Sequence, residues 1–281
     1  MKRCIPCFVL IFLFIYAISF ALDWQELKSE HFIVYFIGDE KFAQEVLDKA
    51  EVYYQRIAYE LGYPRYSNFW TWDRRVKIYI YKEKDEFLKV TSQPNWSEGM
   101  ADYAKKQIVS YAWAKGFVES LLPHEMAHLI FRDFVGFKGE VPLWLDEGVA
   151  QWAEEQKRKD YKAMSKYYLK KETLLVLDVM MTLDIRQVKE NDKIHMRVIQ
   201  SRDGREGVLS LDGKQLVNVY YLQAVSIVGF LIEKYGSDSF AVFCRQLRDG
   251  KSMEESLRFA YPLYIRSLKE LQERWVTYLE E

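Results

Sequence analysis

Apolar residues in the first half of the chain follow a mixed pattern of strands and helices. Runs of β-branched and aromatic residues predict strands at 31–37, 76–81 and 108–113. Apolar residues three or four positions apart predict helices at 40–61 and 84–90, between these strands. The pattern predicts an N-terminal subdomain, over about residues 22–134, that contains a sheet.

The second half of the chain shows helical spacing over most of its length. Helices are predicted at 117–134, over 143–170 as one or two segments, and at 220–235, 238–249, 252–260 and 263–279. Asp-Gly pairs at 203–204 and 212–213 indicate turns between short strands within 193–219. The predicted fold class is α+β, with a mostly helical C-terminal subdomain over about residues 135–281.

The N-terminal segment differs from the rest of the chain. Lys2 and Arg3 precede an apolar run from Ile5 to Leu22, which is typical of a secretory signal. Cleavage after Ser19-Phe20-Ala21 would remove residues 1–21. The run also approaches the roughly 17–25 residues that a membrane-spanning helix needs, so an uncleaved anchor is the alternative. Both interpretations predict an exported protein, periplasmic or extracellular, whose only membrane contact is this segment.

Composition narrows the functional classes. The chain has 40 basic and 41 acidic side chains, and this lack of a basic excess argues against a nucleic-acid partner. Apolar residues make up 49% and charged residues 29%, which excludes a disordered chain and a membrane protein with many spans. Cys244 is the one cysteine after the N-terminal segment, so no internal disulfide is expected.

The strongest chemical signal is His124-Glu125-Met126-Ala127-His128. Residues i and i+4 of a helix share one face, so both imidazoles can reach the same metal ion. Glu125 lies beside that pair, where it can act as general base on a water molecule. Two histidines that merely pack in a core would not explain why a carboxylate accompanies them on an otherwise apolar helix.

A catalytic zinc site usually has three protein ligands. Glu147 is the candidate third ligand, because Gly136 and Pro142 allow the first helix to end and a second helix to pack against it. These residues predict one Zn²⁺ per chain. Glu154 follows Glu147 by two helical turns and is the candidate hydrogen-bond acceptor for one of the ligand imidazoles.

The chain resembles the gluzincin metallopeptidases in two motifs and their spacing. The His-Glu-Met-Ala-His motif is followed, after eighteen further residues, by Glu147 within Trp-Leu-Asp-Glu-Gly-Val-Ala. The resemblance is closest to the bacterial peptidase-MA-like group, which is related to the M1 aminopeptidases. Tyr221-Leu222-Gln223-Ala224 resembles a second segment of that group. The resemblance implies a zincin-like fold over residues 22–281 with the active-site cleft between the subdomains. It also implies a zinc-dependent hydrolase of peptide or protein substrates, in which Glu125 is the base. Tyr221, or else Tyr220, would stabilise the oxyanion.

Some features depart from this family or leave alternatives open. Gly99-Met100-Ala101-Asp102 lacks the Glu-Asn pair with which M1 aminopeptidases bind a free amino terminus, so aminopeptidase specificity does not follow. Tyr221 can instead be a core residue. The protein can also be an exported zinc-binding protein that holds a peptide or a partner without hydrolysis, although the intact Glu125 favours an enzyme.

Two local features bear on the cleft. The predicted strand at 108–113 is a candidate to lie along it and to pair with an extended peptide. Pro123 falls inside the predicted helix 117–134, where proline removes a backbone donor and costs about 3 kcal/mol. A local kink just before His124 is one way for the helix to accommodate it.

Overall fold

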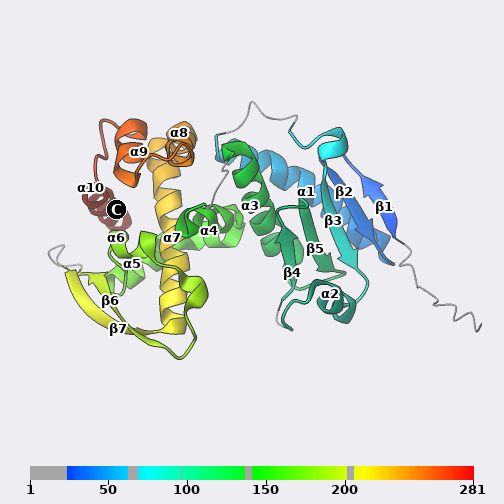
Figure 1. Ribbon diagram of the computed structural model, residues 1–281, viewed down its shortest axis with the longest axis horizontal. Coiled ribbons are helices and arrows are strands. Elements are labelled where there is room, and N and C mark those ends of the chain that lie inside the picture. The colour runs from blue at the N-terminus through cyan, green and yellow to red at the C-terminus, as the bar shows by residue number, and fades with distance from the viewer. Residues whose placement is uncertain (1–23, 63–68, 96, 137–140, 201–205) are drawn as a thin grey trace, which may run out of the picture.

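The computed structural model describes residues 24–281, apart from 63–68, 96, 137–140 and 201–205. The predicted export segment at 1–21 and the predicted turn at 203–204 lie outside the described residues. The described part has a sheet-containing half and a mostly helical half (Figure 1). Two helices, α3 (Leu122–Val135) and α4 (Leu143–Ala153), lie between them. The α+β class and the helical C-terminal part are therefore as predicted.

The first half is built on a five-stranded mixed sheet in the order β1-β2-β3-β5-β4. Its strands are β1 Gln25–Lys28, β2 Phe32–Phe36, β3 Val76–Tyr81, β4 Gly99–Asp102 and β5 Gln107–Tyr111. The three central strands are parallel, and β1 and β4 run antiparallel at the edges. Val34, Ile78 and Ile108 lie in register across the centre and are fully buried, so this row anchors the core.

Helices cover both faces of the sheet. α1 (Glu40–Glu60) packs against β2 on the face that carries Val34 and Ile78. Its start is fixed by Asp39, whose side chain accepts a hydrogen bond from the backbone N–H of Phe42. α2 (Lys84–Thr91) covers part of the opposite face, where Phe87 joins a small apolar cluster with Tyr81 and Val109.

The predicted pairing of strand 108–113 with a peptide is wrong. β5 ends at Tyr111 and is hydrogen-bonded to β3 on one side and to β4 on the other, so neither of its edges can accept another strand. β4 is the edge strand on this side of the sheet, and it packs against α3. The sequence of β4, Gly-Met-Ala-Asp, has no β-branched residue and gives no strand signal of its own.

The predicted helix 117–134 has two parts. Phe117–Leu121 is a π-helical turn, and α3 follows as Leu122–Val135. Pro123 consequently lies in the first turn of α3, where a missing backbone N–H is tolerated. Gly136 ends α3 in a left-handed conformation with φ 74°. The change of helix type, rather than a kink, accommodates the proline just before His124.

The second half surrounds one long helix, α7 (Gly213–Tyr235), which contacts α4, α5 and α8. Its other elements are α4 Leu143–Ala153, α5 Glu155–Lys170, α6 Leu177–Thr182, β6 Lys193–Ile199, β7 Glu206–Asp212, α8 Ser237–Arg248, α9 Met253–Ala260 and α10 Leu268–Glu280. Short 3₁₀ turns occur at Trp72–Arg74 and Ile185–Gln187. β6 and β7 are short strands as predicted within 193–219, and they pair antiparallel. The predicted turn at 212–213 is wrong, because Asp212 caps α7 and Gly213 is its first residue.

α7 begins seven residues before its predicted start. Asp212 and Gln215 form a capping box, in which each side chain accepts the backbone N–H of the other residue. Among the described helices, α7 alone is long and apolar enough to cross a membrane by length and composition. Two thirds of its most apolar window is buried inside the protein, as in a core helix.

Candidate metal centre

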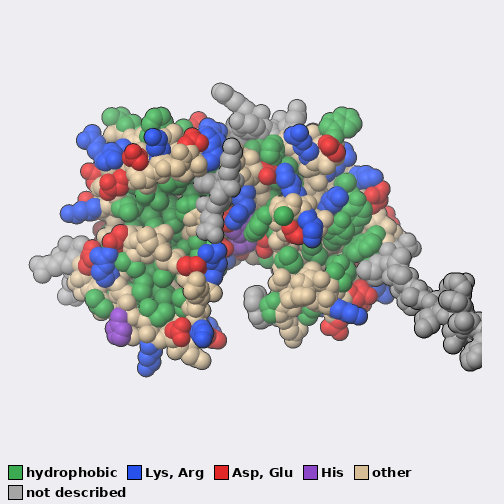
Figure 2. Space-filling view, in the orientation of Figure 1, with side chains coloured by type: hydrophobic (Ala, Val, Ile, Leu, Met, Phe, Trp, Pro, Cys, Tyr) green, Lys and Arg blue, Asp and Glu red, His purple; other side chains and the backbone are tan. Residues whose placement is uncertain are grey.

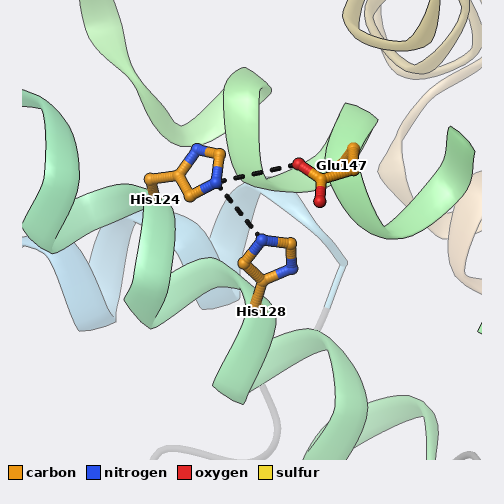
Figure 3. Close-up of side chains that lie close together, drawn as sticks. All are labelled: His124, His128 and Glu147. Atoms are coloured by element: carbon orange, nitrogen blue, oxygen red, sulfur yellow. Dashed lines mark hydrogen bonds and ion pairs between the residues drawn. The ribbon is translucent and has the colours of Figure 1, made fainter. Parts of the chain in front are cut away.

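Three side chains from two helices converge on one point. His124 and His128 project from α3, and Glu147 projects towards them from α4 (Figure 3). The Nε2 atoms of the two histidines are 3.3 Å apart, and a carboxylate oxygen of Glu147 lies 3.9 Å from Nε2 of His124. One ligand atom from each residue lies within 4.8 Å of the others. The structure thus brings together all three predicted ligands.

Carboxylates fix the orientation of both imidazoles. Glu154 lies 2.9 Å from Nδ1 of His124, and Asp146 lies 3.0 Å from Nδ1 of His128. An ionised carboxylate only accepts hydrogen bonds, so the proton of each neutral ring is on Nδ1. The Nε2 lone pairs therefore face each other across 3.3 Å. Two facing lone pairs repel each other unless a metal ion or a proton lies between them.

The donor set fits a zinc ion. Ligand atoms about 2.0–2.1 Å from a tetrahedral metal are about 3.3 Å apart, which is the separation of the two Nε2 atoms. Two imidazoles and one carboxylate are a common catalytic set for zinc. Burial lowers the pKa of His128, but the hydrogen bond and charge of Asp146, with the charge of Glu147, raise it above its usual value. The surroundings thus favour positive charge at this point.

Glu154 lies between α4, which ends at Ala153, and α5, which begins at Glu155. It therefore reaches His124 from the junction of two helices. The prediction had placed Glu154 on the same helical face as Glu147. Burial raises its pKa, but hydrogen bonds from His124 and Ser120 and the charge of Lys157 lower it below the usual value. Ser120 belongs to the π-helical turn before α3, so that turn supplies a second partner for the carboxylate.

Asp146 is a site residue that the sequence argument missed. It is buried, and it also accepts a hydrogen bond of 2.6 Å from Arg132. Burial raises its pKa, but the bonds and charges of His128 and Arg132 lower it below the usual value, so the carboxylate stays ionised. A signal existed: an acidic residue directly before Glu147, and an arginine one helical turn after His128.

Glu125 and His124 line one cleft of about 560 Å³, together with His128 and Glu147. Figure 2 shows a hollow between the two halves of the molecule, with histidine side chains at its inner end. Burial raises the pKa of Glu125, the charges of the histidines oppose that rise, and the backbone N–H of Ala101 on β4 donates to its carboxylate. Glu125 thus lies beside the candidate metal ligands and against β4.

Tyr221 and Tyr220 take different places on α7. Tyr221 lines the cleft, and burial raises the pKa of its hydroxyl to about 12, so it keeps its proton at neutral pH. Tyr220 is fully buried and does not line the cleft, and its hydroxyl has no hydrogen-bond partner among the described residues. Of the two tyrosines, Tyr221 is thus the one that faces the space in front of the candidate ligands.

Gly148 explains how α4 holds Glu147 close to α7. A Cβ atom at this position would lie 2.6 Å from the carbonyl oxygen of Ala224 and 2.8 Å from a methyl group of Val228. Only a residue without a side chain allows the two helices to approach so closely. The glycine therefore sets the distance between α4, which carries Glu147, and α7, which carries Tyr221.

Tyr103 completes the cleft on the side of the sheet. It follows β4, lines the cleft, and its ring centre lies 5.8 Å from that of His128. The guanidinium of Arg132 lies 4.5 Å from the centre of the tyrosine ring, within cation–π distance. Arg132 thus links Tyr103 to Asp146, so the turn after β4 is tied to the groups that hold His128.

No protein-family model matches the chain, and a search of curated proteins finds no match either. The resemblance to gluzincins accordingly depends on the sequence motifs alone.

Proposed function

We propose that this protein is a zinc-dependent peptidase with a zincin-like fold, similar to the gluzincins. The observation that carries the proposal is the convergence of His124, His128 and Glu147, with both imidazoles held by carboxylates, in one cleft with Glu125 and Tyr221. Such a cluster of ligands, base and hydroxyl donor at the wall of a cleft matches what hydrolysis of a peptide bond requires.

Each residue has a defined task in this proposal. A zinc ion, when bound, makes water acidic and polarises a carbonyl group. Glu125 accepts the proton of the attacking water and passes it to the leaving amine. Its burial raises its pKa, which makes the carboxylate a stronger base for the first of these two proton transfers. Tyr221 donates a hydrogen bond to the oxygen of the scissile carbonyl as negative charge grows there.

The test is hydrolysis of a mixed peptide library by the purified mature chain, with and without a chelator. The parental protein should cleave peptides, and the chelator should abolish cleavage until zinc is restored. Glu125→Gln should retain zinc and lose nearly all hydrolysis, because the amide cannot accept the proton. Cleavage by this variant at the parental rate would contradict the assigned chemistry.

The alternative function is an exported zinc-binding protein that holds a peptide or a partner in the cleft. It predicts that the parental protein and Glu125→Gln bind the same peptides and that neither cleaves them. The buried position of Glu125 next to the two histidines favours the enzyme, because a holding site would not need a carboxylate beside the ligands.

We also propose that the protein is exported by its N-terminal segment. The support is the basic start at Lys2 and Arg3 and the apolar run from Ile5 to Leu22. N-terminal sequencing of the purified protein should begin at or near Leu22. An intact Met1 in the membrane fraction would indicate the anchored form, and an intact Met1 in the cytoplasm would rule out export.

A further inference from the structure

One wall of the cleft carries a group of apolar side chains beside the polar residues Gln156, Lys157, Asp160 and Asn218. Helix α5 contributes Tyr161 and Met164 to it, and α7 contributes Leu222 and Val225. Met164 is 45% exposed, although the rest of α5 is rich in charged residues. An exposed large apolar side chain at the wall of a cleft is a typical feature of a binding site.

The charged groups of this wall already have partners. Lys157 lies 3.1 Å from Glu154, and Asp160 accepts a hydrogen bond of 2.6 Å from Gln156. A charged substrate side chain that entered here would lose water and would have to compete for these groups. An apolar side chain would lose no hydrogen bond and would bury its surface against Met164 and Leu222.

Tyr161 in this wall is held in place by its contacts, whereas the exposed side chain of Met164 can adapt its conformation. Tyr161 is buried and its hydroxyl lies 2.7 Å from that of Tyr278. A Cβ atom at Gly229 of α7 would lie 2.7 Å from the Tyr161 ring, so the two helices are in close contact there. Met164 has a flexible, unbranched side chain that fits partners of different shape. The wall can therefore bind large apolar side chains of different shapes, and it is not restricted to a single residue type.

We propose that this wall, formed by Tyr161, Met164, Leu222 and Val225, is a specificity subsite for a large apolar side chain next to the scissile bond. The substrate class is then peptides with leucine, methionine or phenylalanine at that position. This inference rests on the proposed peptidase function, because it takes the wall and the candidate ligands to act on the same substrate. Both line one cleft.

The experiment uses blocked alanine peptides with one variable residue: leucine, phenylalanine, lysine or glutamate. Their binding to zinc-loaded Glu125→Gln is measured by calorimetry, and their hydrolysis by the parental protein is measured by mass spectrometry. The apolar peptides should bind and react at least about 10-fold better than the charged ones, since a single group in an apolar pocket discriminates roughly 10–200-fold.

Variants locate the effect. Met164→Glu should remove most of the preference for leucine and phenylalanine, and Met164→Leu should keep it. Tyr167→Glu is the matched control, because Tyr167 lies on the same helix, is 54% exposed and does not line the cleft. Zinc content and thermal unfolding should be unchanged in all three variants, which separates a change of specificity from a loss of structure.

The outcomes separate the two proposals. Hydrolysis without an apolar preference, or a preference that Met164→Glu leaves intact, overturns the subsite and leaves the peptidase in place. Selective binding of apolar peptides that depends on Met164, without any hydrolysis, overturns the peptidase and the placement next to a scissile bond, and it supports the wall only as a binding site for an apolar side chain. Absence of both hydrolysis and binding overturns both proposals.

Discussion

Gly148→Ala tests whether close packing of α4 on α7 holds Glu147 in place. Alanine should stabilise an ordinary helix position by about 1 kcal/mol relative to glycine. Here its Cβ would lie 2.6 Å from a backbone carbonyl oxygen, which cannot rotate away. Overpacking of this kind costs about 1–3 kcal/mol, so the clash outweighs the gain in helix propensity. We expect a net loss of stability of up to about 2 kcal/mol.

The shift of α4 should be visible at the metal site. The new methyl group would push α4 away from α7, and so move Glu147 relative to the histidines on α3. Zinc affinity should fall about 10-fold or more, as for loss of other groups that orient metal ligands. Thermal unfolding should shift down by roughly 2–4 °C per kcal/mol. Calorimetry with zinc and thermal unfolding measure the two effects.

The control is a core change of similar cost away from the cleft. Ile265→Val, at a fully buried position between α9 and α10, should cost about 0.5–1.5 kcal/mol and leave zinc affinity unchanged. A Gly148→Ala protein that is more stable than the parent, or that binds zinc with parental affinity, would refute the idea that this contact positions Glu147.

Further substitutions address two other site residues. Tyr221→Phe should reduce turnover by about 10²–10³, or about 2.7–4 kcal/mol, without loss of zinc, because one donor to the growing charge is removed. Tyr220→Phe should leave turnover per folded molecule unchanged, and the reverse result in steady-state kinetics would transfer the role to Tyr220. Asp146→Ala should weaken zinc binding about 10- to 100-fold, since His128 loses the group that orients it. Parental zinc affinity in a titration of Asp146→Ala would contradict the role given to Asp146.

Local signals were sufficient for many of the elements. α1 was predictable because a capping residue, Asp39, precedes an amphipathic run that Gly62 ends. The central strands were predictable because they are made of β-branched and aromatic residues. The edge strands β1 and β4 were missed, because their polar or small residues are held in strand conformation by pairing with a neighbour rather than by propensity.

The same distinction applies to the site. His124, His128 and Glu125 follow from helical spacing, which is a local property of the sequence. Glu147 was predicted from the helix-ending residues before it and from the resemblance to gluzincins. The approach of Gly148 to Ala224 depends on residues far apart in the chain, and no local pattern specifies it. The reach of Glu154 to His124 depends on a break between α4 and α5 that helical periodicity did not predict. The motif residues of the site could be predicted from the sequence, whereas the long-range packing that positions them could be seen only in the structure.

The most direct test of the central claim is anomalous diffraction at the zinc edge from crystals of the mature protein grown with zinc. The account predicts one strong peak per chain, with Nε2 of His124 and of His128 at about 2.0–2.1 Å and an oxygen of Glu147 at about 2.0–2.2 Å. A peak held by other residues, or no peak between these three side chains, would contradict it.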